Sequence, residues 1–400
     1  MACMAICLLT SRKYYGVAAG AIMLALLSAC ASQHLELATA GGSPEQESPE
    51  RPTQLIYPPP PAEARFIHEA TILTSADVVP ETRSDRFRQF ATASGRSAEA
   101  FGKPFGLVAR NGRLYVSDTV RRLVHVLDRA KGEYREIGTS ERGRLTKPLG
   151  LAVDDRGRVY VCDVTTQRVM IYDAGGGYVA AVGGPKDLER PSSVAVAPDG
   201  SRIYVLDTGG IRNKQHSIVV FDGEGRRVNV IGKRGAGGGE FNLPLSVKLA
   251  PDGGLYVVDT GNFRVQKLSA SGAPLSSFGK PGRYPGQFGH PKDLALDANG
   301  NIYVTDASFG VFQIFNPSGR ILLSIGERND QGGRGRFLLP AGIGIDVDGR
   351  VYVADQYFRK IEVFRPATLP ETAPPGSRTA QQGAGDAKTG QLPAEARKGN

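Results

Sequence analysis

The sequence predicts an all-β fold, a six-bladed β-propeller whose last blade is closed by a strand from the N-terminal part of the chain. Three observations support this prediction. A unit of 43 to 53 residues recurs six times, each unit reads as short alternating strands separated by turn residues, and the sixth unit lacks its outer strand. A period of this length suits a blade of four strands and is too long for most repeats built from helix pairs.

The composition is that of a globular protein. Of the 400 residues, 40% are hydrophobic and 22% are charged, and the 51 glycines and 26 prolines indicate many turns. These values exclude a collagen, a coiled coil and a wholly disordered chain. The four cysteines are too few for a fold held by disulfides, and Cys162, in the middle of an apolar strand, is expected to be a small buried residue.

The first 29 residues have the features of an export signal. A small basic patch at residues 11–13 precedes an apolar run over residues 16–29. This run of 14 residues is too short for a membrane-spanning helix and is typical of the apolar part of a signal peptide.

The apolar run ends in Leu-Ser-Ala-Cys at residues 27–30, which resembles the lipobox of bacterial lipoproteins. The resemblance implies that residues 1–29 are a lipoprotein signal peptide and that Cys30 carries the lipid that anchors the protein to a membrane. It also implies a location in the cell envelope, and Ala31 favours the outer membrane, facing the periplasm. An ordinary signal peptide with an incidental cysteine is the alternative.

Segments without regular structure are expected on either side of the repeats. Residues 30–63 are rich in Ser, Pro, Glu and Gly, which predicts a disordered tether, and residues 366–400 have a similar composition and predict a disordered tail. Residues 64–76 hold the strand that closes the last blade. Residues 77–103 connect it to the first blade and include a short helix near residues 84–90.

The repeated unit fills residues 104–365. Its second strand ends in Tyr-Val-x-Asp in all six copies, and a proline begins the inner strand of each copy. The six aspartates are Asp118, Asp163, Asp207, Asp259, Asp306 and Asp355. The six prolines are Pro104, Pro148, Pro191, Pro244, Pro291 and Pro340.

The two ends of the folded chain are expected to share the sixth blade. That unit stops after a third strand at residues 361–364, while an unassigned strand with an apolar pattern lies at residues 65–74. Pairing the two strands removes an open sheet edge and closes the ring without a disulfide.

These units resemble the NHL repeat. The shared pattern is Pro-x-Gly-Leu-Ala-Val-Asp, then Gly-x-Val-Tyr-Val-x-Asp, then four residues and Arg-Val, with a glycine-rich loop such as residues 235–244 before the proline. The resemblance covers residues 101–365 and implies a propeller in which the repeat aspartate and the arginine five positions later are structural partners. That arginine is present as Arg168 and Arg264, is replaced by Lys360, and is absent from the other three units.

Basic residues concentrate in the loops of one propeller face. Loops between second and third strands share this face with the loops that join one blade to the next. Residues 101–365 contain 37 Lys and Arg against 27 Asp and Glu, a net charge of +10. The candidate binding residues in the first class of loops are Arg121, Arg122, Arg168, Arg212, Lys214, Arg264, Arg359 and Lys360.

We expect this face to dock an anionic partner in the envelope, namely a protein, a polysaccharide or a lipid headgroup, because clustered arginines attract and bind anions. The alternative is a set of solvated loops with internal Asp–Arg pairs. Export argues against nucleic acid as the partner, and the loops lack the paired aromatics that stack on bases. Phe263, Phe309, Tyr357 and Phe358 in these loops either contact another ligand or pack within the loops.

The mouth of the central channel is the second candidate site. Asp293 is the only carboxylate two residues after an inner-strand proline, and Lys248 is expected beside it. The pair belongs either to a channel-mouth hydrolase or lyase, lactonase-like or peptide-lyase-like, or to a structural ion pair. Lactonase-type propellers hold a divalent ion with several acidic and amide ligands, of which only Asp293 is in place, and the five histidines lack metal-ligand spacing. We therefore expect a binding or scaffold protein rather than an enzyme, with no metal and no cofactor.

Overall fold

The computed structural model describes residues 54–92, 98–210 and 215–377. The expected signal peptide over residues 1–29 and the expected lipidation site Cys30 lie outside these ranges. No helix within the described ranges is long and apolar enough to cross a membrane.

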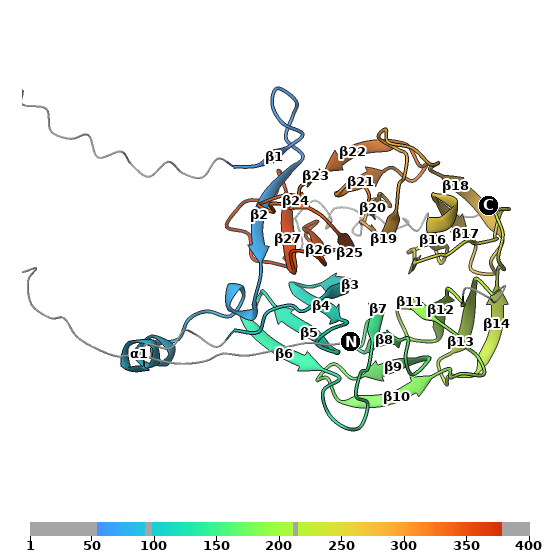
Figure 1. The fold of residues 1–400 in the computed structure, drawn as a ribbon, viewed down its shortest axis with the longest axis horizontal. Helices are drawn as coiled ribbons and strands as arrows, with labels where there is room; N and C mark the ends of the chain where they lie inside the picture. Colours follow the sequence, from blue (N-terminus) through green and yellow to red (C-terminus); the bar gives the residue numbers. More distant parts are fainter. Residues whose placement is uncertain (1–53, 93–97, 211–214, 378–400) are drawn as a thin grey trace, which may run out of the picture. The chain divides into compact units, whose positions relative to one another are not determined.

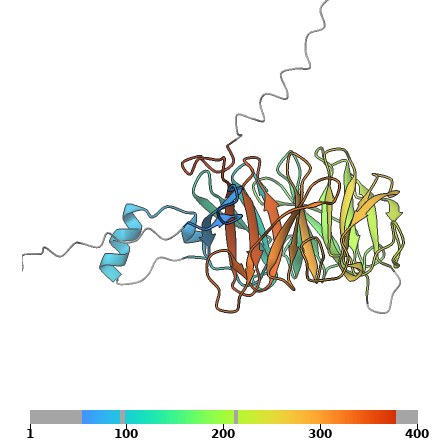
Figure 2. The ribbon, with the colours of Figure 1, turned by 90° about the horizontal axis from the view of Figure 1, so that it is seen from above.

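Six sheets follow one another around a ring, and each sheet is one blade of a propeller (Figure 1). Within every blade the neighbouring strands are antiparallel. Figure 2 shows that the strands run between two sets of loops, which form the two faces of the ring. The predicted six-bladed propeller is confirmed.

Each of the first three blades contains four strands, which follow one another from the channel outward. Blade one consists of β3 (Pro104–Arg110), β4 (Arg113–Asp118), β5 (Leu123–Asp128) and β6 (Glu133–Ile137). Blade two consists of β7 (Pro148–Val153), β8 (Val159–Asp163), β9 (Arg168–Tyr172) and β10 (Tyr178–Val182). Blade three consists of β11 (Pro191–Val196), β12 (Arg202–Asp207), β13 (Ser217–Asp222) and β14 (Arg227–Ile231).

The other three blades complete the ring. Blade four consists of β15 (Ser246–Leu249), β16 (Leu255–Asp259), β17 (Arg264–Leu268) and β18 (Pro274–Phe278). Blade five consists of β19 (Pro291–Leu296), β20 (Ile302–Asp306), β21 (Val311–Phe315) and β22 (Ile321–Ile325). Blade six consists of β25 (Pro340–Ile345), β26 (Val351–Asp355), β27 (Lys360–Pro366), β2 (Phe66–Ile72) and β1 (Ile56–Tyr57).

Short elements lie in the segments that connect the blade strands. A parallel pair of two-residue strands precedes blade six, an α-helix lies in the expected connector, and one of two 3-10 helices follows β16. They are β23 (Glu327–Arg328), β24 (Arg336–Phe337), α1 (Arg83–Thr92), η1 (Ser75–Asp77) and η2 (Thr260–Asn262).

The hydrophobic core lies between neighbouring blades, as the second strand of blade two shows. In β8, Tyr160 and Cys162 pack into the core shared with blade three, while Val159 and Val161 pack into the core shared with blade one. Successive side chains of a strand point to opposite faces, so one alternating strand fills two cores. Cys162 is fully buried, and burial raises the pKa of its thiol well above the usual value.

Strand β2 closes the ring by pairing with β27. Phe66 lies opposite Pro366, and Ile72 lies opposite Ile361. The predicted closing strand is therefore confirmed. The structure differs from the expected boundary of the tether, because β1 falls within residues 30–63 and pairs with the outer edge of β2.

A buried carboxylate on β27 strengthens this closure. The Glu362 side chain is fully buried and accepts hydrogen bonds from Thr71 Oγ1 at 2.7 Å, from the His68 ring and from the Lys360 ammonium. Burial disfavours the charged form, but these donors outweigh it and lower the pKa of Glu362. Two of the donors come from β2, so the polar contacts and the strand pairing act on the same junction.

Glu69 of β2 joins the last blade to the first. Its Oε1 accepts a hydrogen bond from Arg129, in the turn after β5, at 2.8 Å. Its Oε2 accepts one from Arg350, in the turn between β25 and β26, at 2.6 Å. Burial opposes ionisation of Glu69, and the two guanidinium groups overcome it and lower the pKa.

Arg350 also holds the end of the described chain. It is 1% exposed and donates hydrogen bonds to Asp348 and to the carbonyl oxygen of Ala373. The Gly376 N–H in turn donates to Asp348 at 2.7 Å. The first part of the expected disordered tail, residues 366–400, is therefore anchored to blade six, because its backbone satisfies groups buried at the closure.

We expect Arg350→Met to lower the free energy of unfolding by about 3 kcal/mol, because the substitution leaves the buried carboxylate of Asp348 and the partly buried carboxylate of Glu69 without the cation that they share. Chemical denaturation followed by circular dichroism measures the change. The control is Arg320→Met in an exposed turn of blade five, for which we expect a change within about 0.5 kcal/mol. Equal losses in the two variants would contradict a closing role for Arg350.

Candidate ligand-binding face

A buried carboxylate in blade one joins two loops at one face of the ring. Asp118, at the end of β4, is 0% exposed. It accepts hydrogen bonds from the backbone N–H groups of Gly102 and Lys103, on the loop that enters the blade. It also accepts hydrogen bonds from the N–H groups of Val120 and Arg121, on the loop between the second and third strands. Both classes of loops therefore lie at the same face.

The same arrangement recurs around the ring. In four other blades the repeat aspartate binds backbone N–H groups of both loops, and these residues are Asp163, Asp207, Asp306 and Asp355. A carboxylate has enough lone pairs to accept several such bonds, so it is suited to fixing two loops together. We call the surface formed by these two classes of loops the loop face.

These hydrogen bonds keep Asp118 ionised. Burial alone would raise its pKa, but hydrogen bonds from His125 and from the backbone N–H groups of Arg121, Lys103 and Gly102 outweigh burial and lower the pKa to about 2. The Asp118 carboxylate is therefore charged near neutral pH, and hydrogen-bond donors inside the protein stabilise this charge.

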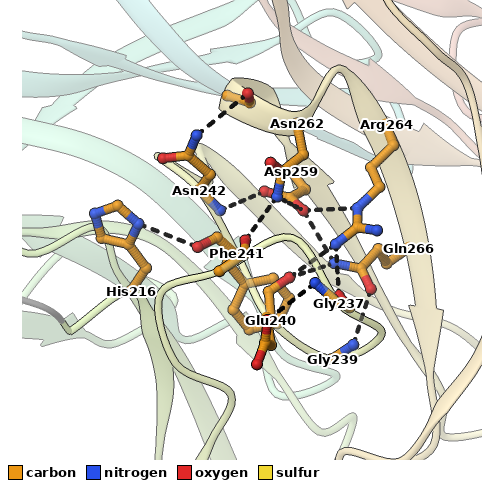
Figure 3. A network of polar contacts seen from close by, with 12 residues as sticks. His216, Gly237, Gly239, Glu240, Phe241, Asn242, Asp259, Asn262, Arg264 and Gln266 are labelled. Atoms are coloured by element: carbon orange, nitrogen blue, oxygen red, sulfur yellow. Dashed lines mark hydrogen bonds and ion pairs between the residues drawn. The ribbon is translucent and has the colours of Figure 1, made fainter.

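Blade four adds side chains to this network (Figure 3). Asp259 accepts a hydrogen bond from Arg264 Nε at 2.8 Å and one from Gln266 at 3.0 Å. Arg264 Nη2 also donates to the carbonyl oxygens of Gly237 and Glu240. The Asp–Arg partnership that the NHL resemblance implied is thus present in this blade, and it occupies the guanidinium of Arg264.

Two of the candidate binding residues are therefore placed differently from the expectation. The Arg264 side chain is 16% exposed, and its Nε and Nη2 donate hydrogen bonds within the network of blade four. The Lys360 side chain is 4% exposed and binds Glu362 and the carbonyl oxygen of Gly333. Sequence position put both on the loop face, but the tertiary contacts draw both cations inward.

Three other candidates lie exposed on the loop face. Arg122, Arg168 and Arg359 are exposed and make no ion pair or side-chain hydrogen bond with any described residue. Arg121 is also exposed, but it pairs with Glu99. Arg212 and Lys214 lie outside the residues that the structure describes.

One backbone position of the loop face has a left-handed conformation in five blades. It is the last residue before the third strand, occupied by Arg122, Gln167, Phe263, Gly310 and Arg359, with φ between 55° and 64°. Glycine adopts this conformation freely, whereas other residues incur a cost of about 1 kcal/mol or more. Four blades nevertheless carry a side chain there, and its chemistry varies from blade to blade while the backbone stays the same.

A pocket of about 560 Å³ opens on the loop face between blades four and five. Its walls include the aromatic rings of Phe263, Phe288 and Phe309, together with Arg283 and Ser308. The sequence analysis identified Phe263 and Phe309 as possible ligand contacts, but it did not predict that they lie beside Arg283 in one pocket. The residues of the pocket belong to three separate loops, so only the folded ring brings them together.

The other aromatic pair of the loop face is at blade six. Tyr357 is 55% exposed, whereas the ring of Phe358 lies 5.2 Å from the ammonium of Lys360 and packs within the loop. Tyr357 therefore faces solvent and could contact a ligand, whereas Phe358 packs within the loop.

The expected ion pair between Lys248 and Asp293 forms at the channel mouth. The Asp293 carboxylate also accepts hydrogen bonds from the two neighbouring blades. Lys248 Nζ lies 3.5 Å from Asp293 Oδ1. Asp293 also accepts hydrogen bonds from Ser246 Oγ at 2.6 Å and from the Ile343 N–H at 3.1 Å. One carboxylate thus connects the inner strands of blades four, five and six, which favours the structural role. The described residues contain no group of three His, Cys, Asp or Glu side chains placed to hold a metal ion.

Comparisons with known proteins agree with the fold. Residues 145–172 and 241–268 match the NHL repeat family. The human E3 ubiquitin-protein ligase NHLRC1 is 35% identical over 122 residues, which is 29% of this chain and 28% of the ligase. The match therefore spans less than a third of the length of this relative.

Solved structures give the same architecture. A protein of unknown function from Bacteroides thetaiotaomicron superposes with a TM-score of 0.54 at 17% identity, covering 68% of this chain and 71% of that chain. A gluconolactonase from Xanthomonas campestris superposes with a TM-score of 0.51 at 18% identity, covering 66% of this chain and 86% of that chain. At these identities the likeness shows the fold alone. The closed ring is a six-bladed β-propeller, and two of its repeats match the NHL repeat.

We expect the contribution of Asp118 to stability to disappear in acid. Its pKa in the folded protein, about 2, lies below its usual value of 3.8, so the contribution of about 2 kcal/mol is fully present above pH 4 and is lost as the pH falls toward 2. Asp118→Asn should be less stable than the parent at pH 6, and the difference should shrink below pH 4.

Denaturant titrations at pH 6, 4 and 2.5 measure this difference. The exposed Asp330→Asn serves as the control and should match the parent at each pH. A deficit of Asp118→Asn that stays constant from pH 6 to 2.5 would show that the carboxylate is not held in its charged form.

Proposed function

We propose that this protein is a lipid-anchored binding module of the cell envelope, whose loop face docks an anionic partner: a protein, a polysaccharide or a lipid headgroup. The observation that supports this proposal most directly is the exposure of Arg122, Arg168 and Arg359 on one face without a described partner. Guanidinium groups bind carboxylates and phosphates in a planar, bidentate manner.

The opposite ends of the strands also carry arginines. There, several arginines of the turns are paired with carboxylates of the same or the neighbouring turn. These pairs are Arg113–Asp128, Arg158–Asp154, Arg226–Asp222 and Arg350–Asp348. Part of the positive charge at that end is thus neutralised by ion pairs, and exposed arginines without an ion pair to any described residue, such as Arg156 and Arg320, also lie there.

A lipid anchor is the second part of this proposal. A lipid on Cys30 would hold the propeller at a membrane surface through the segment before β1, so a partner in the envelope would meet the protein at high local concentration. The channel-mouth pair offers no comparable support for an enzyme, because the oxygens of Asp293 are engaged by the neighbouring blades.

Removal of the three exposed arginines tests the binding face. The variant R122N/R168Q/R359N uses asparagine at the two left-handed positions, which that residue tolerates. We expect it to bind fluorescein-labelled poly-glutamate about tenfold more weakly than the parent, from roughly 0.5 kcal/mol for each exposed contact. Fluorescence anisotropy of the full chain at low salt measures the affinity.

The matched control is R156Q/R202Q/R320Q, which removes three exposed arginines near the opposite ends of the strands. It has the same net charge as the first variant, so general attraction of polyanions changes equally in both. Equal weakening of binding in the two variants would argue against a specific loop face.

The lipid anchor has its own test. In a bacterial host, the full chain should fractionate with membranes and yield an N-terminal peptide that carries a diacylglyceryl group on Cys30, as measured by mass spectrometry. Cys30→Ser should lose both the modification and the membrane fraction, because the acyl chains are the proposed link to the bilayer. An unmodified Cys30 in the mature protein would refute the anchor and leave the binding face untouched.

A further inference from the structure

The pocket between blades four and five has an apolar interior within a basic surface. Phe288 at its base is 0% exposed, and Phe263 and Phe309 are half-buried, so each of the latter two presents part of its ring to the pocket. Pockets of this size bind groups as large as a drug-sized molecule, and apolar lining favours an apolar group. The pocket is therefore large enough for one aromatic or long aliphatic side chain.

The charge of the pocket is positive and is not neutralised. Arg283 is the only charged residue among the described residues that line it, and Arg283 is exposed without an ion pair to any described residue. The repeat carboxylate of blade five, Asp306, is directed into the protein, where it accepts hydrogen bonds from the N–H groups of Gly289, His290 and Ser308. A ligand that fits must therefore combine an apolar group with a negative charge.

The walls of the pocket are fixed before any ligand binds. Phe263 sits at the left-handed position of its turn, and its N–H donates to the Thr260 carbonyl oxygen. Phe288 is held by a hydrogen bond from its N–H to the carbonyl oxygen of Lys280 at 2.9 Å. A side chain at Gly289 would collide with Ser308 and Phe309, so the two loops are in close contact. A preformed site binds with a smaller loss of conformational entropy.

We infer that this pocket receives one large apolar side chain of an acidic peptide segment, and that Arg283 binds a neighbouring carboxylate of that segment. This inference rests on the proposed function and specifies the partner class. We commit to a peptide as the occupant, because one apolar side chain next to a carboxylate matches the partly exposed rings of Phe263 and Phe309 beside the guanidinium of Arg283. Aromatic and arginine side chains that bind in a common pocket are also frequent hot spots of protein interfaces.

Three fluorescein-labelled peptides test the inference by anisotropy with the full chain: Glu-Glu-Phe-Glu-Glu, Glu-Glu-Ala-Glu-Glu and Lys-Lys-Phe-Lys-Lys. We expect the acidic phenylalanine peptide to bind at least tenfold more tightly than the acidic alanine peptide, and the lysine peptide to bind weakest. Phe309→Ser and, separately, Phe263→Asn should reduce the tenfold preference to less than twofold. Arg283→Gln should weaken both acidic peptides by about threefold.

Tyr357→Ser is the matched control, since it removes an exposed aromatic ring from the loop face outside the pocket and should keep the tenfold preference. Thermal unfolding followed by circular dichroism verifies the fold of each variant. If Phe309→Ser does not fold, Phe263→Asn and Arg283→Gln still decide the matter.

The remaining outcomes separate this inference from the proposed function. Equal binding of the two acidic peptides, both weakened in R122N/R168Q/R359N, would overturn the pocket and leave the basic face standing. Equal binding of the acidic and lysine phenylalanine peptides would overturn both. If the parent binds phosphatidylglycerol vesicles and Phe309→Ser weakens that binding tenfold without changing the peptide preference, the pocket serves a lipid and the peptide assignment is wrong.

Discussion

The pairing of β2 with β27 is the constraint on which the rest of the structure depends. Without it, blade six would have three strands and blade one would lack part of the core that it shares with the chain's end, where Ile72 packs with Tyr352 and Ile361. The hydrogen-bonded ladder supplies the geometry. The partly buried carboxylate of Glu69 and the buried carboxylate of Glu362 make the match specific, because each is paired with cations at this junction. Closure keeps all six loop pairs in one surface.

The repeat aspartates convert this closed ring into a defined surface. Each carboxylate accepts hydrogen bonds from the backbone of the loops beside it. The last residue before the third strand then has nearly the same φ in five of the six blades, while the residue type at that position varies. The residues that stabilise the loops therefore differ from those that could bind a partner. Buried charged groups hold the loops in place, while exposed arginines and aromatic rings remain accessible to a ligand. Arg264 and Lys360 belong to the first group, and Arg122 and Arg359 belong to the second.

The sequence was sufficient for the architecture and only partly sufficient for the site. Period, turn residues and the orphan strand at 65–74 are local signals, and they predicted the blades and their closure correctly. Whether a basic residue is exposed depends on contacts that are distant in sequence: Lys360 donates to the Gly333 carbonyl oxygen and to Glu362, a carboxylate that His68 of β2 also binds. The pocket at Arg283 was missed for the same reason, since its walls come from three loops that no linear pattern connects.

Native-state hydrogen exchange of β2 tests the central claim most directly. If this strand closes the ring, the backbone N–H groups of Phe66–Ile72 that pair with β27 should exchange with the same free energy of opening as those of β26, because both open only when the ring unfolds. Rapid exchange of β2 beside a protected β26 would show that the propeller is stable without its N-terminal strand, and would contradict the account.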